Sequence, residues 1–329
     1  MKGKLGWLIL FVASGLIILI APFVGKVAIK LSAIFESGTD SNYIFFSLRL
    51  PRVIFAFLAG AALATAGAVF QALFRNPLAS PFTLGVLAGG SFGATVAIIV
   101  FGGSQIALFG IFGFNIVTVF TFAGCLFDVI LVYIIVSMSK EFSVGRLLLA
   151  GVVLNFFFAA LVQLILYTAD PSRNFALSRF MQGYLGVGGF KAVLEVLPLF
   201  IIGIFSAFYL TQELNLMQLG EEFAITKGVN TNRVKHLSFI TMSLMTAGVI
   251  ALSGPILFVG LMTPHIVRRF TGSHQFRLTL ASIFAGGILL VVCDTIARVI
   301  MPAGELPVGI ITSVLGAPFF LVLLIKDKR

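Results

Sequence analysis

The sequence of 329 residues is 59% hydrophobic and only 10% charged, whereas soluble domains carry about 25% charged residues. A water-facing globule is therefore excluded, because the chain has too little polar surface to cover one. The net charge of +10 would indicate nucleic-acid binding in a soluble protein, but here the basic residues lie mostly between apolar segments. We predict an all-α polytopic membrane protein in contact with the lipid bilayer, without a nucleic-acid partner.

Apolar segments recur along the chain, and most are long enough to cross a hydrocarbon core of about 30 Å, which needs about 20 helical residues. The first is interpreted as a retained span, because no convincing cleavage site follows it. Residues 173–189 are expected to form a short external helix or a re-entrant segment. The predicted spans cover residues 5–25, 51–74, 81–101, 107–138, 146–168, 191–210, 233–253, 256–270, 278–300 and 307–325.

About ten spans place both termini on the same side of the membrane. Basic residues are more numerous in the loops on that side, which predicts cytoplasmic termini. No linker or soluble domain interrupts the chain, so residues 1–329 are expected to form one transmembrane domain. The longest polar insert, residues 211–232, is amphipathic and is broken by Gly220 and Gly228. It predicts two short helices that lie at the cytoplasmic surface and face a partner.

Two segments, residues 67–77 and 254–264, each run from a glycine to a proline that follows a polar residue. Corresponding breaks in two halves of opposite orientation are typical of transporters, so an inverted internal repeat is expected, although chance explains the pattern as well. In the first segment Pro77 breaks a helix because it lacks an N–H, and Asn76 can cap the helix that follows. The break before Leu78 is either a tight cytoplasmic turn or a gate at a pore mouth.

Charged residues mark two further places. Arg49 and Arg52, at the outer start of the second span, either extend to lipid headgroups or pair with an acidic docking protein. Asp294 and Arg298 are four residues apart and therefore share a helical face, where they form a structural ion pair or serve a function. Asp128 is a lone carboxylate within a span, and the sequence offers no partner for it.

Metal and nucleotide chemistry have no support in the sequence. Cys125 and Cys293 lie in apolar segments and are predicted to be small core residues without a disulfide. His236, His265 and His274 are isolated from other ligands, so we expect no metal site and no cofactor. The phosphate-binding pattern G-x-x-x-x-G-K-[ST] is absent, so the chain is not expected to be an enzyme, and ATP hydrolysis would need another subunit.

An ordered series of motifs extends from about Leu48 to Lys326. It comprises Arg49 to Arg52 (RLPR), Gly60 to Gly67 (GAALATAG), Gln71 to Ala79 (QALFRNPLA), Arg146 to Asn155 (RLLLAGVVLN), Gly220 to Glu222 (GEE), Gly254 to His265 (GPILFVGLMTPH), Asp294 to Arg298 (DTIAR), Glu305 to Gly309 (ELPVG) and Leu315 to Phe319 (LGAPF). Each motif alone is weak, but the ordered set resembles the permease family of iron-siderophore, haem and vitamin B12 ABC importers.

The resemblance implies ten spans, a second permease subunit, two ATPase subunits, and an external substrate-binding protein. The second permease subunit is expected to be identical to this chain. It places the docking arginines at Arg49, Arg52 and Arg298, and the inner gate at Asn76, Pro77 and Leu78 and at the turn Val144-Gly145. That second turn often carries a hydroxyl in the vitamin B12 branch, so Val-Gly disfavours a corrinoid. The ATPase contact is implied at Gly220, Glu221, Glu222, Lys227 and Gly228.

The expected function is import of an iron chelate, haem or corrinoid across a bacterial or archaeal cytoplasmic membrane by alternating access. Gly60, Ala64 and Gly67 share one helical face and either line the path or allow close helix packing. The alternative is an ion-driven secondary transporter that uses Asp128 or Asp294 as a proton or sodium relay. A membrane scaffold without transport activity is the third interpretation.

Overall fold

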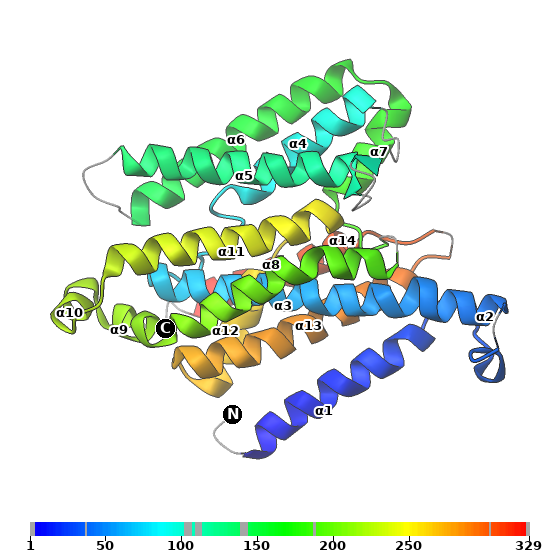
Figure 1. Cartoon of the computed structure of the whole chain (residues 1–329), viewed down its shortest axis with the longest axis horizontal. Helices are drawn as coiled ribbons and strands as arrows, with labels where there is room; N and C mark the ends of the chain where they lie inside the picture. The colour runs from blue at the N-terminus through cyan, green and yellow to red at the C-terminus, as the bar shows by residue number, and fades with distance from the viewer. Residues whose placement is uncertain are drawn as a thin grey trace.

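The chain folds into a bundle of α-helices with one very short hairpin (Figure 1). The computed structural model describes residues 4–36, 38–101, 107–108, 114–138, 144–186, 189–302 and 304–326. The α-helices are α1 (Lys4–Ile20), α2 (Asp40–Asn42), α3 (Leu50–Phe74), α4 (Val86–Phe101), α5 (Ile116–Ser137), α6 (Val144–Thr168), α7 (Pro171–Met181), α8 (Phe190–Tyr209), α9 (Thr211–Leu219), α10 (Glu221–Thr226), α11 (Thr231–Ser253), α12 (Val259–Thr271), α13 (Gln275–Val299) and α14 (Val308–Lys326).

The remaining elements are short. The 3₁₀ turns η1 (Ala21–Phe23) and η2 (Leu31–Ala33) follow α1, and the π-helix η3 (Tyr43–Arg49) leads directly into α3. Strands β1 (Ala107–Leu108) and β2 (Phe114–Asn115) pair antiparallel, with Ala107 opposite Asn115.

Seven helical segments in the described part of the chain are long and apolar enough to cross a membrane. They are α1, the continuous segment from α2 to α3, and helices α5, α6, α8, α11 and α13. Helices α4 and α14 are apolar but shorter. The chain is therefore a polytopic α-helical membrane protein, as its composition predicts.

Two predicted spans begin too early. The prediction of helix over 107–115 is wrong at the described positions, because β1 and β2 lie there and the Asn115 side chain caps α5 by accepting from the Val117 N–H at 3.0 Å. Helix α4 begins at Val86 rather than at residue 81. The preceding turn is closed by a 3.1 Å hydrogen bond from the Ser80 N–H to Thr83 Oγ1 and ends at Gly85, whose φ is +92°.

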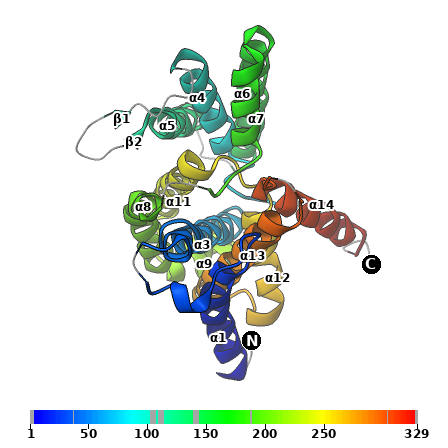
Figure 2. The same ribbon diagram turned by 90° about the vertical axis from the view of Figure 1, so that its right-hand side faces the viewer.

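Helix α3 is the centre of the larger half of the molecule, where it is surrounded by α8, α11, α12 and α13 (Figure 2). All residues from 59 to 74 are buried. Glycines let its neighbours approach closely, because a Cβ at Gly60 would lie 2.2 Å from the Gly286 carbonyl oxygen of α13. Such small-residue contacts are the usual means of packing helices in lipid, where no hydrophobic force drives them together.

Helices α4, α5 and α6 form a second group beside α11 (Figures 1 and 2). Glycines again set the spacing, since a Cβ at Gly89 of α4 would lie 2.5 Å from the Gly124 carbonyl oxygen of α5. A short helix was predicted within 173–189, and α7 is that helix, although it begins two residues earlier and ends at Met181.

Both chain ends lie at the same end of the bundle as α9 and α10, while α2 lies at the opposite end (Figure 1). The prediction of two short helices in 211–232 is confirmed, with Gly220 separating them at a φ of +141°. The two segments of the proposed repeat differ locally. Residues 67–74 are helical throughout, whereas 254–258 are an irregular link before α12, so the inverted repeat stays a prediction.

Candidate functional site

A buried cluster of charged side chains lies where α3 and α13 meet, at the α2 end of the bundle. Arg52 Nε and Nη2 donate to Asp294 at 2.8–3.1 Å, and Arg52 Nη1 donates to Glu305 at 2.7 Å. The Asp294 side chain is 1% exposed and that of Glu305 is 33% exposed. One guanidinium group therefore binds two carboxylates, one of them deep and one accessible.

The other two arginines of this cluster are also buried. Arg298 pairs with Asp294 at 3.2 Å, so the prediction that these two residues share a helical face and pair is confirmed. Arg298 Nη2 donates to the Ala21 carbonyl oxygen and to Thr295, but its Nη1 is buried without a hydrogen-bond partner among the described residues. Arg49 donates to the carbonyl oxygens of Pro22, Phe23 and Val27.

Glu305 and Tyr184 complete the cluster, and the residue patterns alone did not reveal them. The Tyr184 hydroxyl contacts Glu305 at 3.2 Å, and its ring lies 5.3 Å from the Arg52 guanidinium carbon. Partial burial alone would raise the pKa of Glu305, but the hydrogen bond and charge of Arg52, with help from Tyr184, hold that pKa below its usual range. Two hints in the sequence point to Glu305: it begins the motif ELPVG, and it is the one acidic residue between α13 and α14.

The three arginines, Glu305 and Tyr184 line an open cavity of about 520 Å³. Its walls carry three arginines and Lys26, and among the described residues two carboxylates balance their charge: Glu305 on the wall and the buried Asp294. A carboxylate or another anion is the chemical group that such a cavity suits, because guanidinium groups bind carboxylates through charge-assisted hydrogen bonds.

The predicted break after α3 is a tight turn at the other end of the bundle. Arg75 adopts the left-handed conformation with φ of 50°, and Asn76 Oδ1 accepts from the Leu78 N–H at 2.9 Å. Leu78 is exposed. Gly145, assigned to a second turn, instead lies within the first turn of α6, and the side chain of Val144 lies outside the described residues.

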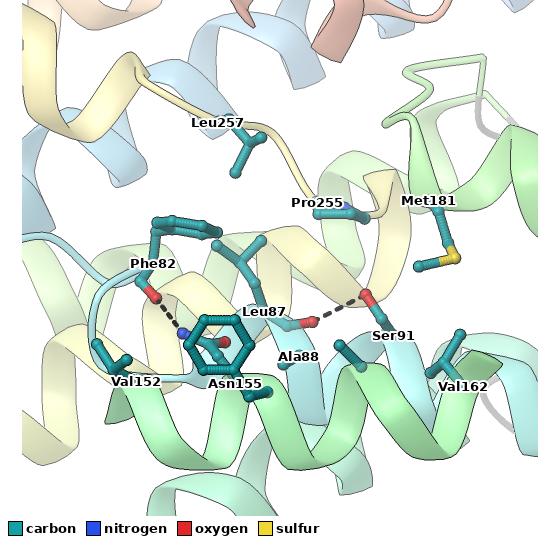
Figure 3. A pocket seen from close by; sticks show the side chains of 12 residues that line it. Phe82, Leu87, Ala88, Ser91, Val152, Asn155, Val162, Met181, Pro255 and Leu257 are labelled. Atoms are coloured by element: carbon teal, nitrogen blue, oxygen red, sulfur yellow. Dashed lines mark hydrogen bonds between the residues drawn. The ribbon is translucent and has the colours of Figure 1, made fainter. Parts of the chain in front are cut away.

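An apolar cleft of about 480 Å³ opens between Phe82, α4, α6, α7 and the link from α11 to α12 (Figure 3). Its polar groups are few: Asn155 Nδ2 donates to the Phe82 carbonyl oxygen at 3.2 Å, and Ser91 bonds within α4. The link contains Pro255 and ends at Phe258, whose φ of 65° is uncommon for a bulky residue. No residue pattern in the sequence predicted the strained backbone at Phe258.

The small residues of α3 face other helices of the same chain. Gly67 lies so close to α12 that a Cβ there would be 1.7 Å from the Gly260 carbonyl oxygen, and the Ala64 Cβ lies against Gly286 of α13. With Gly60 packed on α13 as well, the structure favours the close-packing interpretation for all three residues over the pathway interpretation.

The segment 211–232 is held to the bundle by an ion pair. Glu221, at the start of α10, pairs with the Lys235 side chain of α11, which is 6% exposed. Glu222 and Lys227 are exposed, and Gly228 lies just after α10 with a φ of +83°. The surface that α10 presents therefore carries charges, while one of its carboxylates is tied to a membrane helix.

The two cysteines predicted to be core residues are buried as expected, and so is the lone carboxylate Asp128. Cys125 and Cys293 are free thiols with no exposed surface. Asp128 of α5 is fully buried, and neither carboxylate oxygen has a hydrogen-bond partner among the described residues. No group of three or more His, Cys, Asp or Glu side chains in the described ranges could hold a metal ion.

Comparison with known proteins gives a consistent result. An ABC transporter permease protein of Methanocaldococcus jannaschii is 39% identical, over 87% of this chain and 83% of the relative. The iron(3+)-hydroxamate import system permease protein of Bacillus subtilis is 33% identical, over 90% of this chain and 88% of the relative.

Among solved structures, a metal-chelate type ABC transporter in an inward-facing conformation superposes with a TM-score of 0.84 at 29% identity, covering 96% of this chain and 97% of that one. Residues 10–326 match the FecCD transport family. The chain therefore belongs to the FecCD transport family.

Proposed function

We propose that this chain is the membrane-spanning permease subunit of an ATP-binding cassette importer for an iron chelate. The observation that carries the proposal is the match over residues 10–326 to a transport family, on a bundle with a cation-rich cavity at one end and helices α9 and α10 at the other. A siderophore or haem is preferred as cargo over a corrinoid. The hydroxamate importer among the relatives supports this preference.

The proposed topology has ten spans in one domain of residues 1–329, in a bacterial or archaeal cytoplasmic membrane. The seven long apolar segments, the shorter helices α4 and α14, and α12 make up this number. The termini, α9 and α10 are cytoplasmic in this topology. The basic residues at that end, among them Arg75, Arg146 and Arg233, support it because cytoplasmic loops are enriched in Lys and Arg.

Three kinds of partner follow from the proposal. Two ATPase subunits bind the segment from Gly220 to Gly228, and an external substrate-binding protein docks at the arginine cavity. A second copy of this chain covers α6, where Gln163 is exposed on a spanning helix. Polar side chains in spanning helices usually face protein or water rather than lipid, which supports an interface or path there.

Transport would proceed by alternating access, with ATP binding closing the ATPase dimer and α10 transmitting the motion. The inner gate would comprise the turn at Asn76, Pro77 and Leu78 and the start of α6 at Val144 and Gly145. An ion-driven mechanism through Asp294 is disfavoured, because Asp294 already binds Arg52 and Arg298.

The test is uptake of an iron(3+)-hydroxamate into liposomes that hold the permease with its ATPase, and the substrate-binding protein outside. We expect ATP-dependent uptake, and loss of uptake with retained assembly in the double variant Glu221→Gln and Glu222→Gln. Asp170→Asn, at an exposed position far from α10, is the control. Uptake by the permease alone, driven by a proton gradient without ATP, would overturn the proposal.

A further inference from the structure

Each of the three guanidinium nitrogens of Arg52 already donates to a resident carboxylate. A guanidinium group has five N–H donors in a planar fork. The Nε and Nη2 side of this fork binds Asp294, and Nη1 binds Glu305. An incoming carboxylate that approaches Nη1 therefore competes with Glu305 for this nitrogen.

The two resident carboxylates differ in how firmly they are held. Asp294 lies within α13, is 1% exposed, and also pairs with Arg298 one helical turn away. Glu305 lies in the connection between α13 and α14, is 33% exposed, and is bound by Arg52 and the Tyr184 hydroxyl. Glu305 is thus the carboxylate that a side-chain rotation can withdraw without breaking a helix.

The backbone beside Glu305 is anchored on both sides. Lys26 donates to the Gly304 carbonyl oxygen, and the Leu306 N–H donates to the Ala297 carbonyl oxygen at 3.1 Å. An exchange at Arg52 would therefore move the Glu305 side chain while its loop stays in place.

The cavity also contains a hydrogen-bond donor, on Arg298, that is available to an incoming carboxylate. Arg298 is 4% exposed and lines the cavity, yet its Nη1 has no hydrogen-bond partner within the described residues. With three arginines against two carboxylates, the cluster is one negative charge short of neutrality before Lys26 is counted. A third carboxylate would supply both the missing charge and an acceptor for Arg298.

We propose that Glu305 is an exchangeable internal partner of Arg52, which occupies the position that a carboxylate of the docked substrate-binding protein takes over. The inference rests on the proposed docking role of the cavity. In the undocked state Glu305 binds the Nη1 end of the buried Arg52 guanidinium group, whose other side binds Asp294. On docking it leaves Nη1, and the incoming carboxylate bridges Arg52 and Arg298.

The proposal predicts that removing the resident charge tightens docking. Glu305→Gln no longer competes for Arg52 and no longer repels the incoming carboxylate, so we expect the Kd of the substrate-binding protein to fall about tenfold, with a steeper dependence on salt. Tyr184→Phe, which only loosens Glu305, should tighten docking by a smaller factor. Glu305→Asp keeps the charge and should remain close to wild type.

The measurement is surface plasmon resonance with the full permease–ATPase complex in nanodiscs and the substrate-binding protein from the same organism. Glu36→Gln is the matched control, because it removes an exposed carboxylate near α2, outside the cavity, and should change Kd less than twofold. Arg49→Gln tests the docking site itself and should weaken binding. Only complexes with wild-type basal ATPase activity are compared, and Tyr184→Phe decides the question if Glu305→Gln does not assemble.

The outcomes separate the inference from the function on which it rests. If Arg49→Gln weakens docking while Glu305→Gln and Tyr184→Phe leave it unchanged or weaken it, the exchange is refuted and the docking site stands. If Arg49→Gln has no effect on docking, the cavity is not the docking site and both are refuted. Tighter docking by Glu305→Gln with an inert Glu36→Gln supports the exchange.

Discussion

Asp294 is the residue whose replacement should destabilise this protein most among its charged positions. It accepts three hydrogen bonds from Arg52 and pairs with Arg298 at 3.2 Å, and it has no exposed surface. Asp294→Asn leaves two buried guanidinium groups with Glu305 as the remaining carboxylate of the cluster. Removing one partner from a buried ion pair costs about 3–5 kcal/mol, because the remaining charge stays out of water without compensation.

The expected shift in thermal midpoint follows from that free energy. At roughly 2 °C per kcal/mol for a long chain, Asp294→Asn should melt about 6–10 °C below wild type. A thiol-reactive dye is a suitable probe in detergent, because Cys125 and Cys293 are free and fully buried until the protein unfolds.

The control is Asp170→Asn. Asp170 pairs with Arg173 at 3.8 Å, and its side chain is 76% exposed. Exposed ion pairs of this kind contribute about 0–1 kcal/mol, so this variant should melt within about 2 °C of wild type. Equal melting of Asp294→Asn and wild type would refute the view that the cluster is a buried, mutually compensated charge network.

Three further predictions concern other parts of the molecule. Gly67→Ala should destabilise the protein by about 1–3 kcal/mol, because its Cβ would lie 1.7 Å from the Gly260 carbonyl oxygen, while Gly15→Ala, with nothing within 4 Å, should melt like wild type. The lowered pKa of Glu305 means that its pair with Arg52 stabilises the fold above the ordinary glutamate pKa of about 4.3, and that this contribution is lost as pH falls through the lowered value. The melting points of wild type and Glu305→Gln should therefore differ at pH 7 and converge as the pH falls through the lowered pKa; a constant difference would contradict the pairing. Asp128→Asn should keep ATP-driven uptake, because neither oxygen of Asp128 has a hydrogen-bond partner among the described residues; loss of uptake would favour an ion relay.

Local patterns predicted most helices well. The span predicted at 51–74 is α3 (Leu50–Phe74), and that at 233–253 is α11 (Thr231–Ser253). The length of an apolar segment is a local property of the sequence, so a spanning helix can be predicted without knowing which other helices it packs against. Errors occurred at helix starts such as Ile116 and Val86, where a single capping side chain or a glycine decides the boundary.

The pairing of Asp294 with Arg298 could also be predicted from the sequence, because residues four apart share a helical face. The pairing of Arg52 with Asp294 and Glu305 could not be predicted in this way, since about 240–250 residues separate Arg52 from these carboxylates along the chain. Their contact depends on α3 and α13 approaching closely at Gly60 and Gly286, which no single-sequence pattern specifies.

The sequence by itself determined that this chain lies in a membrane, where its helices run, and that a two-helix segment lies between residues 211 and 232. Those features depend on composition and short-range periodicity, which each stretch of chain carries within itself. Only the tertiary structure decided that Gly60, Ala64 and Gly67 pack against other helices, and that three arginines and Glu305 line one cavity. The physical reason is that charge compensation and close packing depend on distances between helices, and those distances are set by the whole bundle.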